Sequence, residues 1–264
     1  MVDLETIVVR PRRVPNARLT LVCLGFCGGG TRAYLDWLPL LPEHVELAAI
    51  CYPGREGRFA EPFAKDWNEL AEDTTRAVLH AADLPYVLFG HSMGGWMAFD
   101  VASRIAARGG RNPEALVVSS ANAPSRGLTP QDMFPAQQDS DDELAKWMHT
   151  FGLMPDYVLS DPDLQQMALD LMRADIRVRD TFHYRDGARV GIPLQVLTGS
   201  TDEVIESATA DQWRAIADGP FRHDVLTGGH FYTPEIWRTL PNRIAALDEA
   251  RRLYVAGMQP VPVT

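Results

Sequence analysis

Short apolar runs that alternate with segments of helical periodicity constrain the fold of this chain most strongly. The runs are rich in Val, Ile and Leu, and they cover residues 20–26, 45–52, 86–89, 115–119 and 194–198, with a shorter one at 222–226. Between them, residues 67–82 repeat apolar side chains at helical spacing, and residues 96–108 form a second helical pattern that ends at a glycine pair. Strands that are apolar throughout and alternate with helices are typical of a parallel sheet covered on both faces. The sequence therefore predicts an α/β fold with a mostly parallel central sheet flanked by helices.

The stretch from 124 to 186 breaks this alternation. It is rich in Met, Leu and Asp, its pattern is helical, and it is long for one connection between two strands. We interpret it as a helical lid inserted into the fold. The chain has 264 residues, 46% of them hydrophobic, which is enough for one filled core plus a small insertion, and no segment has the composition of a linker. We therefore expect a single domain over residues 1–264.

Net charge and cysteine content narrow the range of partners and compartments. The formal net charge is −10, whereas nucleic acid binding needs clustered basic residues, so we expect no nucleic acid partner. Cys23, Cys27 and Cys51 have no regular spacing, which argues against a disulfide framework and against a metal site. The N-terminus lacks a signal-peptide core, and no apolar run reaches the roughly 18 residues of a membrane span. We expect a cytoplasmic protein without membrane contact.

The strongest chemical signal is the G-x-S-x-G motif Gly90-His91-Ser92-Met93-Gly94, which lies between a predicted strand and a predicted helix. A nucleophile elbow requires this context, because the turn is too sharp for side chains at the two glycine positions on either side of the serine, Gly90 and Gly94. The turn lifts the hydroxyl out of the sheet and aims the N-terminal amides of the helix at the same place. The motif predicts Ser92 as the nucleophile of a serine hydrolase, with a chance glycine-rich turn as the alternative.

The candidate base is His230. A serine hydroxyl needs a base to take its proton, and in this kind of fold the acid and then the histidine follow the serine along the chain. His230 comes just after the last short apolar run, behind a glycine pair that lets the chain turn toward the edge of the sheet. His223 lies within that run, and His149 and His183 lie in the expected lid. A buried structural role for His230 is the alternative.

The candidate acid is Asp202. It follows the run at 194–198 directly, whereas the competing loop at 120–123 contains no carboxylate. Glu203 and Glu206 remain alternatives, as does a surface role for Asp202. In the predicted triad Asp202 would fix the tautomer of His230 and stabilise its charged form.

Two backbone amides are expected to stabilise the negative charge that develops on the substrate oxygen. One is the N–H of Met93, which follows the nucleophile. The other should come from the loop after the first strand, residues 26–29, where we favour Cys27. A second nucleophile at Cys27 and a plain loop role are the alternatives, and no histidine lies near it in sequence.

The expected lid carries flexible and aromatic apolar side chains that suit an acyl-binding pocket. These residues are Met133, Phe134, Trp147, Met148, Met154, Met167 and Met172. At helical spacing such residues also form ordinary helix cores, so the pocket and the core interpretations both stay open.

With these residues in place, the chain resembles the stand-alone type II thioesterases of polyketide and nonribosomal peptide assembly lines over residues 21–247. The matching motifs are Cys27-Gly28-Gly29-Gly30, Tyr52-Pro53-Gly54-Arg55, residues 89–95, Arg173-Ala174-Asp175, residues 199–202 and residues 228–231. The Y-P-G-R and R-A-D elements are not general features of hydrolases and point to this family. The chain departs from the family pattern at residues 25–27 and 200–203. For this reason we carry no detailed acyl selectivity over from the family.

The resemblance implies an α/β-hydrolase fold and hydrolysis of acyl groups from the phosphopantetheine thiol of acyl or peptidyl carrier proteins. It also implies that Ser92, Asp202 and His230 act as nucleophile, acid and base through an acyl-enzyme intermediate, with no metal or organic cofactor. We expect a free-standing monomer whose carrier protein is a separate, transient partner. Because carrier proteins are generally acidic, as this chain is, we expect docking to use a local basic patch such as Arg55 and Arg58.

Two further functions stay open on the sequence. A carboxylesterase for small oxygen esters would use the same triad and differ in its leaving-group preference. A binding protein of the same fold that has lost catalysis is the third possibility, against which the complete set of Ser92, Asp202 and His230 counts.

Overall fold

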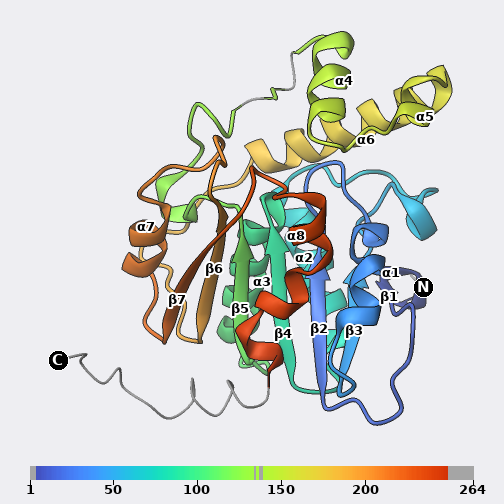
Figure 1. The fold of residues 1–264 in the computed structure, drawn as a ribbon. Coiled ribbons are helices and arrows are strands. Elements are labelled where there is room, and N and C mark those ends of the chain that lie inside the picture. Colours follow the sequence, from blue (N-terminus) through green and yellow to red (C-terminus); the bar gives the residue numbers. More distant parts are fainter. Residues whose placement is uncertain (1–3, 134, 137–138, 249–264) are drawn as a thin grey trace.

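The computed structural model describes residues 4–133, 135–136 and 139–248 and places a seven-stranded sheet at the centre of the molecule (Figure 1). The strand order is β1-β3-β2-β4-β5-β6-β7. The strands are β1 (Val8–Val9), β2 (Leu19–Leu24), β3 (Val45–Ile50), β4 (Tyr86–His91), β5 (Ala115–Ser119), β6 (Leu194–Gly199) and β7 (Phe221–Leu226). Only β1 pairs antiparallel with its neighbour, so the predicted mostly parallel sheet is confirmed.

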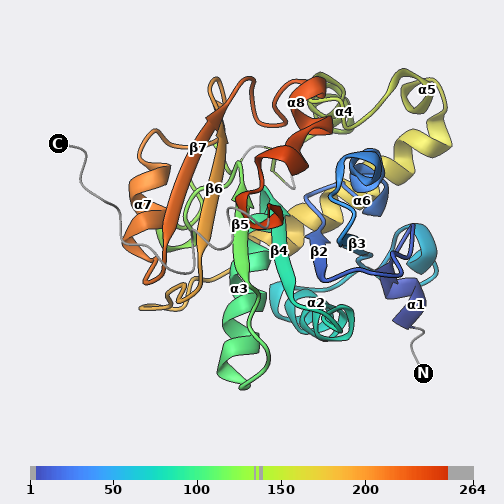
Figure 2. The ribbon, with the colours of Figure 1, turned by 60° about the horizontal axis from the view of Figure 1, so that its bottom comes forward.

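Helices cover both faces of the sheet (Figure 2). One face carries α2 (Trp67–Ala81), α3 (Met93–Ala107) and α7 (Thr209–Ala215). The other carries η1 (Thr31–Leu40), α8 (Pro234–Arg238), η4 (Leu240–Arg243) and η5 (Ala245–Leu247). Two short helices, α1 (Leu4–Ile7) and η2 (Glu56–Arg58), complete this part of the chain.

The central strands are apolar throughout because both of their faces are buried. In β2, Val22 and Leu24 pack with the layer of α2 and α3, whereas Leu21 and Cys23 pack with the layer of η1. All four side chains are fully buried. A strand buried on both faces shows no polar alternation, which is why the apolar runs located the strands.

The boundaries differ from the sequence-based expectation at the functional turn. Helix α3 begins at Met93, not at residue 96. Gly94 and Gly95 belong to its first turn, where they allow close packing, and they do not form a loop. A Cβ atom on Gly94 would lie 2.7 Å from the carbonyl oxygen of Gly25, and one on Gly95 would lie 2.9 Å from Val118. Strands β2 and β3 also end earlier than expected, and α1 and β1 were not predicted.

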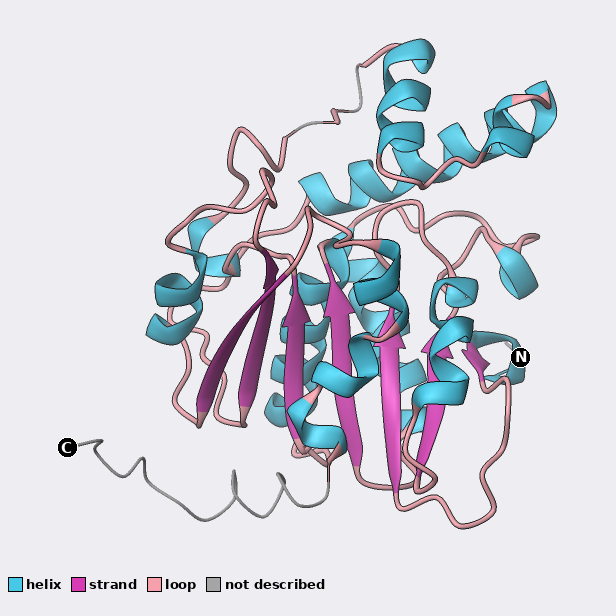
Figure 3. Cartoon of the chain, in the orientation of Figure 1, coloured by secondary structure: helices cyan, strands magenta, loops and turns pink. Residues whose placement is uncertain are grey.

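Residues 124–186, called the lid segment below, contain η3 (Pro124–Arg126), α4 (Asp141–Thr150), α5 (Asp156–Leu159) and α6 (Pro162–Asp180). The last three lie beyond the carboxyl ends of the strands (Figure 3). Ser140 forms a capping box at the start of α4, and the side chain of Asp161 caps α6. Helices α4 and α6 share an apolar cluster that is separate from the two sheet layers. No helix in the described part of the chain is long and apolar enough to cross a membrane.

Candidate active site

Ser92 lies at the tight turn between β4 and α3. Its backbone has φ 53° and ψ −125°, a region that is strained for a residue with a side chain. The turn excludes a side chain two residues before the serine, because a Cβ atom on Gly90 would lie 1.8 Å from the carbonyl oxygen of Gly94. Ser92 therefore has the backbone conformation of a nucleophile elbow, with its hydroxyl beyond the end of the central strand.

His230 reaches Ser92 from the loop after β7. The Nε2 atom of His230 lies 3.0 Å from the Oγ atom of Ser92. Two glycines bring the loop this close: a Cβ atom on Gly199 would lie 2.3 Å from the carbonyl oxygen of Gly229, and Gly228 has a φ of 115°. The glycines around this histidine thus allow the His230 loop to lie directly against the end of β6.

Asp202 completes the hydrogen-bonded chain from the loop after β6. Its carboxylate oxygens lie 3.1 and 3.2 Å from the Nδ1 atom of His230, and Oδ1 also accepts the N–H of Val204 at 3.0 Å. An ionised carboxylate can only accept, so Nδ1–H donates and Nε2 is left to accept the proton of Ser92. Burial opposes the charged form, but the interactions with His230 and Val204 outweigh it and lower the pKa of Asp202 below its ordinary value of 3.8.

The structure brings together the three residues that the sequence singled out and leaves the competing carboxylates and histidines apart from Ser92. Glu203 is exposed, and Glu206 forms an ion pair with Arg126. His223 contacts Thr198 on the neighbouring strand through Nε2. The two lid histidines, His149 and His183, are exposed.

The two residues expected to supply the backbone donors line the same cavity. Cys27 and Met93 both line the cavity that contains Ser92 and His230, and their sulfur atoms lie 3.5 Å apart. Within the described residues, neither backbone N–H donates to another protein group, so both are free to meet a substrate oxygen. Burial raises the pKa of the Cys27 thiol to about 12, which keeps it protonated and argues against the alternative of a second nucleophile.

The cavity above Ser92 has an empty volume of about 560 Å³, part of which is open to solvent. Its walls come from both the sheet and the lid segment, and they include Trp96, Val204, Trp147, Met172, Ile176 and Arg179. Of the lid residues expected to line a pocket, only Trp147 and Met172 do so among those that the structure describes. Met148 and Met154 lie in the lid's own apolar cluster, Met133 and Met167 are exposed, and Phe134 lies outside the described residues.

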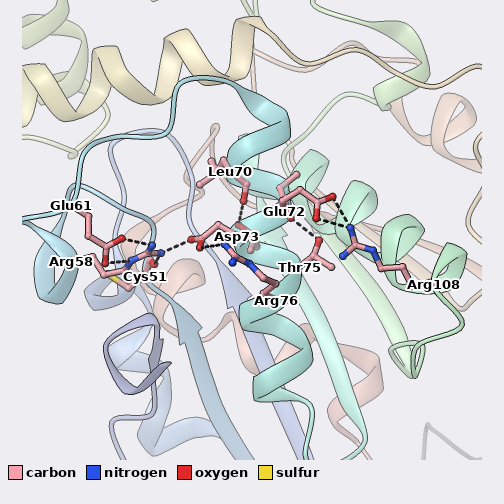
Figure 4. Close-up of polar contacts among 11 residues, drawn as sticks. Cys51, Arg58, Glu61, Leu70, Glu72, Asp73, Thr75, Arg76 and Arg108 are labelled. Carbon is pink, nitrogen blue, oxygen red and sulfur yellow. Dashed lines mark hydrogen bonds and ion pairs between the residues drawn. The ribbon is translucent and has the colours of Figure 1, made fainter. Parts of the chain in front are cut away.

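The expected basic docking patch at Arg55 and Arg58 is wrong, because both side chains are buried. Arg55 is 5% exposed and pairs with Asp175, and Arg58 is 4% exposed. Figure 4 shows Arg58 between Glu61 and Asp73, with a further hydrogen bond to the carbonyl oxygen of Cys51. Each guanidinium is neutralised inside the protein, so neither is available to an acidic partner. The sequence does not reveal the burial of Arg55, because its partner Asp175 lies 120 residues further along the chain.

Asn122 supports the site, a role that no pattern in the sequence indicated. The loop at 120–123 supplies no acid, but the amide oxygen of Asn122 accepts from the N–H of Glu206 at 2.8 Å and from the Thr209 hydroxyl at 2.7 Å. Its amide nitrogen donates to Asp132 at 3.1 Å. Asn122 therefore ties the loop that carries Asp202 to the start of the lid segment. A lone asparagine carries no signal of such a role.

A second polar chain lies behind the triad. The Nδ1 atom of His91 lies 3.0 Å from the hydroxyl of Ser119, which lies 2.7 Å from the hydroxyl of Tyr232. Burial, followed by the electrostatic effect of His230, lowers the pKa of His91 well below its ordinary value. His91 is therefore a neutral ring packed beside the ring of His230, at a centroid distance of 5.1 Å.

No group of three or more His, Cys, Asp or Glu side chains that could hold a metal ion occurs among the residues that the structure describes. The chemistry that the site can perform with its own groups is proton transfer and nucleophilic attack by a serine, with backbone amides beside it.

A protein-family model and several known proteins match this chain. The family model described as "Thioesterase domain" matches residues 19–244. The chain is 33% identical over 237 residues to thioesterase PikA5 of Streptomyces venezuelae, covering 88% of this chain and 81% of that protein. It is also 34% identical over 213 residues to the AMB antimetabolite synthetase AmbE of Pseudomonas aeruginosa, covering 81% of this chain but only 10% of that much longer protein.

Among solved structures, the chain is similar to the type II thioesterase BorB from the borrelidin biosynthetic cluster. The TM-score is 0.80 at 33% sequence identity, and the match covers 94% of this chain and 99% of BorB. This similarity confirms the α/β-hydrolase fold that the sequence predicted.

Proposed function

The chain belongs to the thioesterase family, and from that premise we propose that it hydrolyses acyl thioesters held on the phosphopantetheine arm of carrier proteins in polyketide or nonribosomal peptide biosynthesis. The observation that carries the proposal is the hydrogen-bonded chain from Ser92 through His230 to Asp202 at the floor of a cavity with largely apolar walls. Such a chain activates a serine toward an acyl carbon, and the apolar walls suit the acyl group.

In the proposed first step, the Oγ atom of Ser92 attacks the thioester carbon while its proton moves to Nε2 of His230. Asp202 holds the imidazole in the required tautomer and stabilises the imidazolium that forms. The negative charge moves to the former carbonyl oxygen, where the N–H groups of Cys27 and Met93 stabilise it. The carbon–sulfur bond then breaks, the pantetheine sulfur leaves as a thiol with the proton from His230, and Ser92 is left acylated.

In the proposed second step, water releases the acyl group. His230 takes a proton from the water as it attacks the acyl-Ser92 carbon, and the same backbone donors stabilise the second oxyanion. The ester bond breaks, the Ser92 oxygen recovers a proton from His230, and the product leaves as a free acid. Because a thiolate is a good leaving group, the first step needs less acid assistance than the cleavage of an amide.

The lid segment supplies the selectivity in this proposal. Trp147, Met172 and Ile176 come from α4 and α6, and they face the cavity that the triad opens into. We assign to residues 124–186 the role of a lid on a single domain of residues 1–264. The carrier protein is the proposed partner of the enzyme, and the monomeric state and cytoplasmic location expected from the sequence stay predictions.

The decisive experiment compares hydrolysis of an acyl-pantetheine thioester with hydrolysis of the matching oxygen ester. We expect faster thioester cleavage by the wild type and its loss in Ser92→Ala. A clear preference for the oxygen ester would identify a carboxylesterase instead. Activity that survives in Ser92→Ala would show that the nucleophile is misassigned, and full inactivity of the wild type toward both esters and toward a fluorophosphonate would favour a binding protein.

A further inference from the structure

The loop at residues 25–29, called the donor loop below, is held by a buried ion pair from two distant segments. The N–H of Gly28 donates to Oδ2 of Asp175 at 2.8 Å, and Nη1 of Arg55 donates to the carbonyl oxygen of Gly29 at 2.7 Å. The two side chains bind each other through both carboxylate oxygens, at 2.6 and 2.9 Å. Arg55 and Asp175 are 5% and 2% exposed. The desolvation of an ion pair so deeply buried costs free energy that can exceed the attraction between the charges. Stability alone therefore does not explain why this pair is buried.

The donor loop is also enclosed sterically. The hydroxyl of Tyr52 donates to the carbonyl oxygen of Gly25 at 3.3 Å, and the guanidinium of Arg55 lies 5.3 Å from the centre of the Tyr52 ring. On the other side, Gly28 has a φ of 72°, and a Cβ atom there would lie 2.5 Å from the methyl group of Met172. The loop is thus clamped between the segment that follows β3 and helix α6.

These contacts determine where the N–H of Cys27 points. The carbonyl oxygen of Phe26 belongs to the same peptide plane as that N–H, and it accepts the N–H of Gly29 at 2.9 Å. A planar trans peptide directs its C=O and N–H in opposite directions, so fixing one fixes the other. Gly28 and Gly29, the residues that Asp175 and Arg55 hold, therefore set the orientation of the expected oxyanion donor.

We propose that Arg55 and Asp175 are positioning residues, which hold the N–H of Cys27 toward the oxyanion and couple it to the placement of the lid helix α6. The inference rests on the proposed function, in which Cys27 donates to the transition state. Neither side chain lines the cavity that contains Ser92, so they act through the loop and do not touch the substrate. The Y-P-G-R and R-A-D motifs then serve one purpose, although 120 residues separate Arg55 from Asp175.

The coupling follows from the origin of Asp175. It lies in α6, three residues after Met172 and one residue before Ile176, both of which line the cavity. A displacement of α6 would move the pocket wall and the acceptor of the Gly28 N–H together. Both oxyanion donors are therefore in place only when α6 also forms its part of the pocket wall.

The test uses Asp175→Asn, which keeps the shape and removes the charge, and the double variant Arg55→Met/Asp175→Leu, which removes both anchors without leaving a buried charge unpaired. We expect kcat for butanoyl-pantetheine to fall about 10- to 100-fold in both variants while KM stays within about twofold, because a misdirected donor weakens only the transition state. Butylboronic acid, which forms a tetrahedral adduct with the serine, should lose affinity by a similar factor. The butyl thioether of pantetheine, which resembles the ground state, should bind as before.

The matched control is Arg58→Met/Asp73→Leu, which removes the buried guanidinium of Arg58 together with its partner Asp73 in α2 (Figure 4). Neither side chain has a hydrogen bond to the donor loop among the described residues. This variant should lose thermal stability and keep kcat within about threefold. Circular dichroism and cooperative unfolding establish that each protein folds. The proposal is overturned if the folded Asp175→Asn and double variants keep wild-type kcat and boronate affinity, or if the control loses both equally.

The ratio of kcat in each variant to kcat in the wild type separates this inference from the proposed function. Each variant is compared with the wild type on whichever ester the wild type cleaves faster. A wild type that prefers the oxygen ester contradicts the thioesterase proposal, and the variant-to-wild-type ratios on that ester still decide the positioning role.

Discussion

Burial and local partners set the protonation states of the side chains around Ser92. The pKa of Asp202 lies below its ordinary value, so this residue stays ionised beside His230. Burial holds the pKa of Cys27 high and that of His91 low, so both of these groups stay uncharged. Asp202 therefore places a fixed negative charge on the side of the imidazole that faces away from the serine. This arrangement favours proton uptake by Nε2 of His230 when the serine attacks.

Asp202→Asn tests this arrangement directly. Asparagine has the same shape but offers no charge and can turn its NH₂ group toward His230, which selects the wrong imidazole tautomer. We expect kcat to fall by about 10³- to 10⁴-fold with little change in KM. Steady-state kinetics on an acyl-pantetheine thioester measures this, and Glu203→Gln, at an exposed neighbour, is the control. A loss below tenfold would contradict the role of Asp202 as the acid.

The lowered pKa of Asp202 also predicts how stability depends on pH. The folded state binds its proton less readily than the unfolded state, so the carboxylate contributes stability that is fully present above the unfolded pKa, near 3.8. That contribution is lost as the pH falls through the lower folded pKa. The difference in unfolding free energy between wild type and Asp202→Asn should therefore stay constant above about pH 5 and shrink as the pH falls from there toward about pH 2. Urea unfolding across this range measures it, and a constant difference would argue against the pKa shift.

The side chain of Cys27 should be dispensable although its backbone is proposed to be essential. Cys27→Ala keeps the N–H and removes a thiol whose pKa of about 12 makes it unreactive at neutral pH. We expect kcat within about threefold of the wild type and no inactivation of the wild type by iodoacetamide at pH 7. Loss of activity comparable to that of Ser92→Ala would instead support a nucleophilic Cys27.

At the level of elements, the sequence predicted those parts of the fold that depend on local patterns. The apolar runs located the buried strands, and G-x-S-x-G located the turn, because short stretches of chain determine both. The helix start at Met93 was missed because glycine in a helix suggests a break, whereas here Gly94 fits against the backbone of Gly25. The pairing of Arg55 with Asp175 was also missed, since no local pattern shows which distant segment will supply a buried carboxylate.

The turn between β4 and α3 predicts a strong effect for one added methyl group. In Gly90→Ala the new Cβ atom would lie 1.8 Å from the carbonyl oxygen of Gly94, and no flexible side chain can move to relieve the clash. We expect a loss of more than about 2 kcal/mol in unfolding free energy together with loss of activity. Chemical denaturation and a thioester assay measure the two effects.

Gly191→Ala is the matched control for that variant. Gly191 is exposed, its φ is negative, and a Cβ atom there would meet no other atom within 4 Å. This change should alter the unfolding free energy by less than about 0.5 kcal/mol and leave activity intact. Equal effects at both positions would show that Gly90 is not constrained by the turn.

On the scale of the whole molecule, the sheet and the lid segment have separate apolar cores. The two layers on the sheet support β4, β6 and β7, whose ends carry the triad, and a third cluster holds α4 and α6 together. The cavity lies where these parts meet, and its walls come from both. Changes to the lid side chains that line the cavity should therefore alter which acyl group fits, and away from Asp175 they should leave the chemistry at Ser92 the same.

Ile176→Ala tests this division. Ile176 lies in α6 and lines the cavity, so its truncation enlarges the space beside the acyl chain. We expect the ratio of kcat/KM for octanoyl- over acetyl-pantetheine to rise about 10- to 100-fold, within the range that one methylene group produces in an apolar pocket. Leu169→Ala, buried in the same lid cluster but away from the cavity, should lower the Tm and leave that ratio unchanged. A ratio that shifts equally in both variants would mean that lid stability, and not the shape of the cavity wall, sets chain-length preference.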